Sequence, residues 1–519
     1  MGLGNRKITR SQFLTAIAFG SPIVLAAAIA GCGGVVGPLA STSPPAVVQS
    51  LTASDITALV QAAAQAADPN TMVIALVDRS GNIVGVYRKP SAPALATGNF
   101  SVQVDTNELA VSLARTAAFF SNDQAPLSSR TVRFLSGIHF PPGIADTPNA
   151  PLYGIENTNR GCALSTNFIA GQSVPPARSI SGATTSLGVA TGKVNVDDSD
   201  SSAVNPGGVP LFRNGSVVGG IGVAGVAPAV AEYVAYAAAT SNGFGPAPAA
   251  PGVVFIGGVA LPFVNQTTPP AGVSAGTFTG SFVVGPIASP GTPPEGMLVA
   301  PAAGPLGGLA ASDVTAIINN SIATANATRA VIRLPIGSSA RMAIAVADLD
   351  GTIIGLYRMV DSTVFSIDVA ATKARNMVYF SGPARTATDL TGVPMGTAVT
   401  NRTIGYGAQP FFPPGISGAS AGPFFSLYLR DVMNPCTEGF QAAGPNQSGV
   451  VFFPGSVPLY RNGVLVGGLG VSGDGVDQDD VVAAGGSLGF EAPAAIRADQ
   501  IVLQGVRLPY LKFPSNPAN

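Results

Sequence analysis

The feature that most constrains the fold of this chain is an internal duplication. Residues 72–88 return as 342–358 with 9 of 17 positions identical, and residues 209–225 return as 457–473 with 12 of 17 identical. The octapeptide at Leu51 and the segment Phe140-Pro-Pro-Gly-Ile also return, in the same order. Because similarity in a fixed order indicates repeated structural units, we predict two domains, over residues 51–264 and 309–519. Residues 265–308, rich in Pro, Gly, Thr and Ala, are the predicted linker.

Three helices are predicted in each copy. Ser54 and Ser312, each followed by an aspartate, are typical of helix N-caps, and apolar residues follow them at helical spacing. Second helices are expected over residues 108–120 and 369–380, and a last helix follows the glycine-rich run of each copy.

Two hairpins accompany the helices in each copy. In the first copy, β-rich runs at 74–77 and 83–87 are joined by a Ser-Gly-Asn turn, and Asn-Gly at 214–215 predicts the second hairpin. Asn-Gly returns at 462–463. Hairpins in place of β-α-β units predict an α+β fold, in which helices pack on an antiparallel sheet.

The amino terminus has the pattern of an export signal. Three basic residues up to Arg10 precede a mainly apolar run over residues 13–30, which ends in Ile-Ala-Gly-Cys32. This ending resembles a bacterial lipobox, which implies cleavage before Cys32 and lipidation of its thiol. We therefore predict a signal peptide at 1–31, a tether at 32–50 and an extracytoplasmic, membrane-anchored lipoprotein in the periplasm or on the cell surface. The alternative is an ordinary signal peptide with an incidental cysteine.

Composition excludes several functional classes. With 26 basic and 27 acidic residues there is no electrostatic footprint for nucleic acid. One His, three Cys and no Trp exclude most metal-enzyme constellations. The Gly-x-Gly-x-x-Gly runs at 220–225 and 468–473 follow hairpins, so they predict close packing of strand on helix and not a dinucleotide site. The start of a helix, where acidic residues are favoured, explains the aspartates at 474, 477, 479 and 480. A calcium site is the alternative, and whether these residues bind a metal is unknown.

Three motifs recur in order in both copies, complete in the second and with substitutions in the first. An Ala-Val-x-Asp-x-x-Gly hairpin ending in Tyr-Arg is followed by a helix that carries Lys373-Ala374 in the second copy. A Val-Pro strand, a run of glycines ending in Val-Ser-Gly, and an acidic helix start come later. This order resembles the GlcG/HbpS-like haem-binding family, also called haem-degrading, whose fold is a profilin-like α+β layer. The resemblance implies two tandem profilin-like domains that form a pseudo-dimer, with haem as a ligand.

The two copies differ at the polar positions of these motifs. The second repeat has Lys373, Ser472 and Asp479, where the first has Leu113, Ala224 and Ala231. We therefore predict that a ligand site, if present, belongs to the second repeat. Its predicted residues are Lys373, Tyr357, Ser472, Asp479 and Asp480.

The haem that the resemblance implies has no obvious axial ligand, because haem iron is usually held by His, Cys, Met or Tyr. The only histidine, His139, lies in a long loop, and Phe411 stands at its position in the second repeat. The remaining candidates, which core packing explains equally well, are Tyr357, Tyr379, Met342 and Met359.

Two cysteines remain beyond Cys32. Cys162 lies 22 residues after Phe140, and Cys436 lies 24 residues after Phe412, so the two occupy equivalent positions. Equivalent residues meet where two copies pack about a pseudo-two-fold axis, and disulfides persist in exported proteins. We predict a Cys162–Cys436 bridge; the alternative is two separate buried thiols.

Three functions are consistent with these patterns. The first is a lipid-anchored, non-catalytic binding protein for haem or another small apolar ligand. The second is a structural or interaction lipoprotein whose long Gly/Pro loops contact protein partners. The third, by family analogy alone, is an oxidative haem-degrading enzyme.

Overall fold

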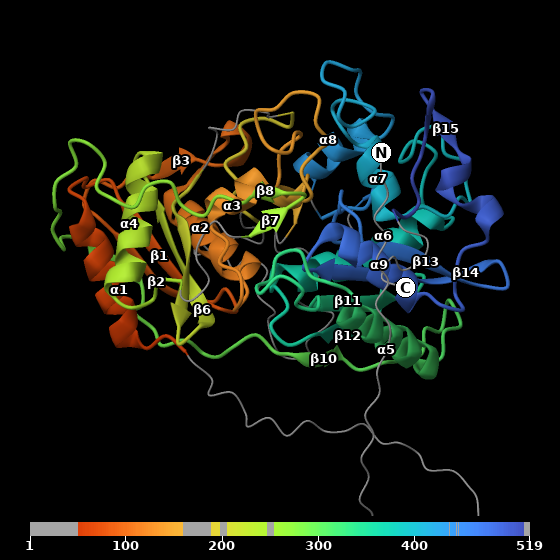
Figure 1. The fold of residues 1–519 in the computed structure, drawn as a ribbon, viewed down its shortest axis with the longest axis horizontal. Coiled ribbons are helices and arrows are strands. Elements are labelled where there is room, and N and C mark those ends of the chain that lie inside the picture. Colours follow the sequence, from red (N-terminus) through yellow and green to blue (C-terminus); the bar gives the residue numbers. More distant parts are fainter. Residues whose placement is uncertain are drawn as a thin grey trace, which may run out of the picture. The chain divides into compact units, whose positions relative to one another are not determined.

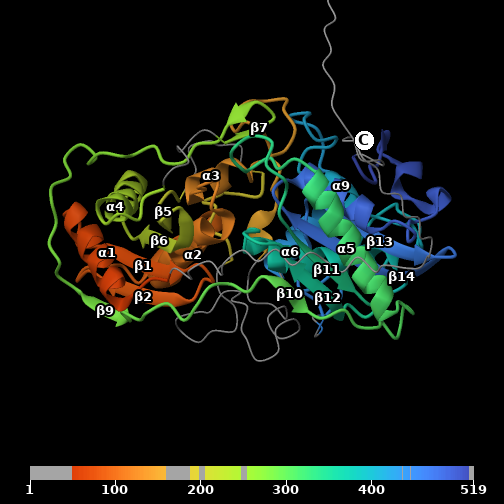
Figure 2. The same ribbon diagram turned by 60° about the horizontal axis from the view of Figure 1, so that its bottom comes forward.

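The computed structural model describes residues 50–158, 188–197, 205–246, 254–434, 436–442, 444 and 446–512. Each repeat contains one five-stranded antiparallel sheet. The two repeats are shown in Figure 1. The strand order is β5-β6-β1-β2-β9 in the first sheet and β10-β12-β11-β14-β13 in the second, and these strands are labelled in Figure 2. The predicted signal peptide, Cys32 and Cys162 lie outside the described residues, so lipidation and the Cys162–Cys436 bridge stay predictions.

The first repeat follows the predicted order of elements. Its helices and strands are α1 (Ala53–Ala66), β1 (Val73–Asp78), β2 (Ile83–Arg88), β3 (Leu95–Thr97), β4 (Gln103–Asp105), α2 (Thr106–Phe120), α3 (Ser129–Phe134), β5 (Gly208–Arg213), β6 (Ser216–Ala224), α4 (Pro228–Ser241), β7 (Phe255–Ile256) and β8 (Val259–Ala260). The β3–β4 hairpin, which is absent from the second repeat, lies between β2 and α2.

The second repeat has the helices and strands that correspond to those of the first, except the β3–β4 hairpin. Its helices and strands are α5 (Ala311–Ala327), β11 (Met342–Ala347), β12 (Ile353–Arg358), α6 (Phe365–Ser381), α7 (Asn401–Gly407), α8 (Phe425–Met433), β13 (Ser456–Arg461), β14 (Val464–Gly473), α9 (Val476–Gly486), β15 (Val502–Leu503) and β16 (Val506–Arg507). Short 3-10 turns span Asn99–Ser101, Ile155–Asn157, Ala494–Ile496 and Ala498–Gln500.

Each sheet is covered by helices on both faces. In the first repeat, α1 and α4 cover one face and α2 covers the other (Figure 2). Strand β1 is buried along its whole length because alternate residues pack against the two layers: Ile74 and Leu76 face α1 and α4, whereas Val73 and Ala75 face α2. The inner helices α2 and α6 share one apolar core, in which the rings of Phe120 and Phe365 stack with centroids 4.0 Å apart. The predicted α+β pseudo-dimer is confirmed.

The glycine-rich runs let each inner helix approach its sheet closely, as the sequence predicted. A Cβ atom added at Gly222 would lie 2.0 Å from the carbonyl oxygen of Ala110 in α2, and one at Gly470 would lie 2.0 Å from that of Ala370 in α6. Any side chain there would collide with helix backbone, which cannot rotate away.

We therefore expect Gly470→Ala to lower the free energy of unfolding by about 1–3 kcal/mol or more, as overpacking does. The equivalent change, Gly222→Ala, should have a similar effect in the first repeat. Chemical denaturation followed by circular dichroism measures both. A loss below about 0.5 kcal/mol in either variant would show that helix and sheet can separate without strain.

The segment predicted as a linker also contributes strands. Strand β9 (Ser281–Val284) pairs with β2, and β10 (Gly296–Val299) pairs with β12, so one strand completes the edge of each sheet. Both pairings are antiparallel, with one irregularity of register each. The Pro- and Gly-rich stretch is therefore part of both folded repeats.

The predicted helix caps were wrong by two residues. Helix α1 begins after Thr52, whose hydroxyl accepts the amide of Asp55 at 3.2 Å while the Asp55 carboxylate accepts the amide of Thr52 at 2.8 Å. Helix α5 begins after Ala310, whose amide donates to Asp313 at 2.7 Å. The aspartate at the third helical position fixes the start of each helix, and the serine lies inside the first turn.

Candidate functional site

Lys373 and Asp479 form a buried ion pair in the second repeat. Lys373 lies in the middle of α6, and Asp479 lies in the first turn of α9, which follows the glycines of β14. The Lys373 Nζ lies 3.0 Å from Asp479 Oδ2 and donates to the carbonyl oxygen of Val471 at 2.8 Å. The same ammonium lies 4.9 Å from the centre of the Phe453 ring. Two of the predicted ligand residues, Lys373 and Asp479, therefore contact each other.

Burial strongly affects both charges of the pair. Lys373 is 0% exposed and Asp479 is 2% exposed. Burial raises the pKa of the Asp479 carboxyl and lowers the pKa of the Lys373 ammonium, and the opposite charge of the partner counteracts each change. A pair of this kind is stable only while both members are present.

A small cavity lies beside the pair and is shared by the two repeats. Its volume is about 90 Å³, and most of its wall is apolar. The second repeat supplies four polar residues, Ser472, Asp477, Gln478 and Asp479, and the apolar or glycine residues Val331, Ile332, Phe365, Phe453, Gly473, Gly475 and Val476. The first repeat closes the cavity with Phe120, Leu127, Leu135, Pro151, Leu152 and Ile256.

Two side chains of the cavity lining carry an acceptor without a partner. Oδ1 of Asp479 and Oε1 of Gln478 are buried and have no hydrogen-bond partner among the described residues. An orphaned buried acceptor is costly, by about 1–3 kcal/mol. A hydrogen-bond donor brought to either oxygen would remove that cost.

Of the five predicted ligand residues, three come together here. Ser472 lies in β14 beside the cavity, and its hydroxyl lies 3.2 Å from that of Ser366. Tyr357 lies elsewhere: it pairs with Ile344 across the sheet and packs in the core beneath α5, away from the wall of the cavity.

Asp480 belongs to a different ion pair. It contacts the Arg402 guanidinium of α7 and accepts the amide of Gly455 at 2.9 Å. Arg130 and Glu232 form the equivalent pair in the first repeat, at 2.6 Å. A pair retained in both copies holds α3 or α7 against the last helix and has a structural role.

The described residues around the cavity do not fit a haem iron. Its described lining contains no His, Cys, Met or Tyr. His139 donates through Nδ1 to the Thr147 carbonyl at 3.0 Å, and Tyr379 donates to Asp389 at 2.6 Å. The sulfur of Met359 accepts the amide of Met342, which lies in the core. We therefore derive no chemistry through haem at this site.

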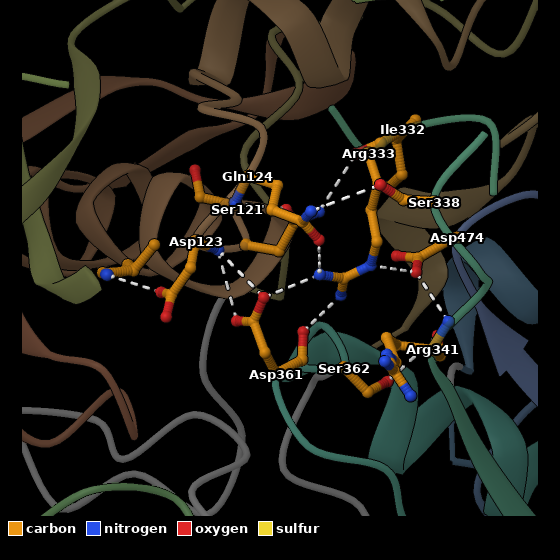
Figure 3. Close-up of polar contacts among 12 residues, drawn as sticks. Ser121, Asp123, Gln124, Ile332, Arg333, Ser338, Arg341, Asp361, Ser362 and Asp474 are labelled. Carbon is orange, nitrogen blue, oxygen red and sulfur yellow. Dashed lines mark hydrogen bonds and ion pairs between the residues drawn. The ribbon is translucent and has the colours of Figure 1, made fainter. Parts of the chain in front are cut away.

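Sequence reasoning missed a polar network that joins the repeats (Figure 3). Arg333, from the loop before β11, contacts Asp474 and donates to Asp361 at 2.7 Å and to Gln124 of the first repeat at 3.0 Å. The amide of Asp123, also in the first repeat, donates to the Asp361 carboxylate at 3.1 Å. Burial raises the pKa of Asp474 to about 6, and Arg333 opposes the rise. No local sequence pattern marks Arg333, because its partners come from three distant segments.

A buried acid on α6 was also missed. Asp368 is 2% exposed, and neither of its carboxylate oxygens has a partner among the described residues. Burial raises the pKa of Asp368 to about 7, and the charge of Arg375 opposes this rise.

Asp368 should make the protein less stable as the pH rises. Its pKa in the folded state, about 7, lies above the unfolded value of about 3.9. The folded state therefore binds the extra proton between these values, and stability falls as pH increases through that window. At pH 8 this effect lowers the free energy of unfolding of the wild type by an amount on the order of 3 kcal/mol. Asp368→Asn should remove this cost, so the variant should have a higher Tm than wild type at pH 8.

Asp313 provides the matched control for this prediction. Arg461 and the amide of Ala310 lower the pKa of Asp313, so its contribution is present above the unfolded pKa and is lost on acidification. Asp313→Asn should therefore give no gain at pH 8. Equal Tm values for wild type and Asp368→Asn at pH 8 would contradict the prediction.

The described residues contain neither a candidate membrane span nor a candidate metal cluster. No helix in them is long and apolar enough to cross a bilayer. Within the same ranges, no group of three or more His, Cys, Asp or Glu side chains is arranged to hold a metal ion.

Comparison with known proteins identifies both repeats. The family model described as "Haem degrading protein HbpS-like" matches residues 51–240 and 309–487. Among solved structures, Klebsiella pneumoniae protein ORFY is 18% identical, with 34% of this chain and 88% of that chain covered and a TM-score of 0.23. A PduOC–haem complex is 21% identical, with 35% and 94% covered and a TM-score of 0.23. A comparison with curated proteins gave no match.

The two family matches coincide with the two α+β repeats and together span well over half of the chain. They contain the hairpins, the inner helices and the glycine-rich strands on which the resemblance depended. This chain therefore belongs to the HbpS-like family and carries two tandem copies of its domain.

Proposed function

We propose that this protein is an exported, lipid-anchored, non-catalytic binding protein whose inter-repeat cavity holds a small, mainly apolar ligand with one hydrogen-bond donor. The observation that supports this is a mainly apolar lining that includes Asp479 and Gln478, whose Oδ1 and Oε1 have no partner among the described residues. Lys373 and Asp479 neutralise each other, so neither is free to act as a general acid or base.

Because of the family, haem is the first ligand to test. The size of the cavity, however, favours a ligand smaller than haem. A volume of about 90 Å³ lies well below the roughly 300–1,000 Å³ of sites for drug-sized ligands. A porphyrin could enter only if the two repeats separated, which would break the shared core of α2 and α6.

Indole and indene form a matched pair of probes, because only indole carries an N–H donor. We expect indole, at about ten times its Kd, to raise the Tm by roughly 2–4 °C, and indene to have a clearly smaller effect. Thermal unfolding of the full chain measures both. Equal effects of the two compounds, or no saturable shift with either, would overturn the proposal.

Two substitutions locate the bound probe. Val331 lines the cavity, so Val331→Phe should fill it and abolish the indole effect. Val360 is 64% exposed and does not line the cavity, so Val360→Phe should leave the effect unchanged. Hemin titrated into the same variants gives the second arm: a Soret shift that Val331→Phe abolishes would contradict the size argument and favour haem.

The anchoring part of the proposal rests on the sequence Ile-Ala-Gly-Cys32 and has its own test. Cells producing the wild-type protein should retain it in the detergent phase after phase partitioning. Cys32→Ser should move it to the aqueous phase, because the lipid acceptor is lost. A wild-type protein found in the aqueous phase would refute the anchor.

A further inference from the structure

The first repeat contains a much roomier cleft at the position that corresponds to the cavity. Leu113, Ala224 and Ala231 occupy the places of Lys373, Ser472 and Asp479, and all three line this cleft. Its volume is about 560 Å³, and every described residue in its lining comes from the first repeat. The equivalent space in the second repeat is closed by side chains of the first repeat.

The contrast reverses one expectation from the sequence. Loss of the polar residues suggested that the first repeat had lost its site. The structure shows that the first repeat has no ion pair at these positions and that the described wall of its cleft is uncharged, with apolar side chains beside neutral polar groups. The volume falls within the range of sites for small organic molecules.

The cleft has a wall that the second repeat lacks. The chain between β2 and α2, residues 89–105, forms the β3–β4 hairpin, whereas residues 359–364 join β12 directly to α6. Leu95 of β3 lines the cleft and is 55% exposed. The side-chain amide of Gln103 donates to the Thr97 hydroxyl at 2.9 Å, and that of Asn205 donates to the Thr97 carbonyl at 3.4 Å.

The chemistry of the lining defines the ligand. Among the described residues that line the cleft, none is charged. Its polar side chains are Thr71, Thr97, Gln103 and Asn205. An ionic ligand would lose its hydration here without gaining a counter-charge, whereas an uncharged apolar one would lose little.

We propose that the cleft between α2, the start of α4 and the β3–β4 hairpin is a second binding site, which takes an uncharged, mainly apolar small molecule. Haem does not meet this description, because it carries two carboxylates and needs an iron ligand, and the described lining has no cation, His, Cys, Met or Tyr. The site is independent of the inter-repeat cavity.

Two fluorescent probes test the charge requirement. N-phenyl-1-naphthylamine is neutral, and 1-anilinonaphthalene-8-sulfonate carries the same rings with a sulfonate. We expect saturable binding of the neutral probe to the full chain, and at least tenfold weaker binding of the anionic one. No saturable binding of the neutral probe, or equal affinity for the two, would overturn the proposal.

Two substitutions in one hairpin locate the probe. Leu95 and Val102 are both 55% exposed, but only Leu95 lines the cleft. Leu95→Asp should weaken binding of the neutral probe at least fivefold, and Val102→Asp should not change it. If both variants bind as wild type does, the probe binds elsewhere and the cleft is not a site. Val331→Phe, which fills the inter-repeat cavity, should leave this binding unchanged, so the two proposals can fail separately.

Discussion

Replacing Asp479 by alanine is expected to lower the free energy of unfolding by about 3–5 kcal/mol. The change removes the carboxylate that the Lys373 ammonium contacts, and this ammonium is 0% exposed; the Val471 carbonyl and the face of Phe453 do not replace the lost charge. Lys373→Leu alone should also destabilise the protein, because it leaves the Asp479 carboxylate buried without its cation. Denaturant unfolding followed by circular dichroism measures each variant.

The double variant Lys373→Leu/Asp479→Ala should recover most of this loss. It installs the residues that the first repeat has at these positions, Leu113 and Ala231, which pack in an intact fold. Replacing a buried ion pair by apolar residues is often neutral or stabilising, so we expect a stability within about 1–2 kcal/mol of wild type. Additive losses in the double variant would show that the two charges do not act as a pair.

Removing Arg333 should have the second large effect, on the coupling of the repeats. Arg333→Met leaves Asp474 buried without its guanidinium and breaks the links to Asp361 and Gln124. We expect a loss of about 3–5 kcal/mol and a broader thermal transition, because one contact between the repeats is lost. Calorimetry detects both changes.

A partly exposed ion pair, whose arginine also lies over the ring of Tyr510, provides the control for Arg333. Arg497 and Asp499 lie 3.2 Å apart with side chains 29% and 24% exposed. Arg497→Met should cost no more than about 1 kcal/mol. If Arg333→Met costs as little, the network of Figure 3 does not hold the repeats together.

The fold could be predicted because its determinants are local and appear twice. Asn-Gly turns, alternating strands and amphipathic helices are each encoded within a few residues, and the second copy repeats them. Strands β9 and β10 were missed because they are four-residue segments inside Pro- and Gly-rich sequence. Edge strands of this kind are defined by the partner strand, which lies far away in the chain.

The site could be predicted only in part. Comparing the repeats singled out Lys373 and Asp479, since a charged pair present in one copy stands out against apolar residues in the other. The comparison of the repeats did not show that Tyr357 lies away from the site. Tyr357 lies on the α5 side of the sheet because it pairs with Ile344 of the neighbouring strand. The side chains that close the cavity come from the first repeat. Contacts between two repeats leave no periodic pattern in the sequence of either one.

The positions of β9 and β10 determine where the chain can be divided without removing a strand from either sheet. A fragment that ends at residue 264 would lack β9 and leave β2 as an unpaired edge, a template for aggregation. The backbone contacts of the first repeat continue to Ser289, whose amide donates to the carbonyl oxygen of Leu51. Strand β10 of the second sheet begins at Gly296. Proteolysis or gene truncation between residues 290 and 295 would therefore leave each sheet its fifth strand, although the apolar face between α2 and α6 would still draw the halves together.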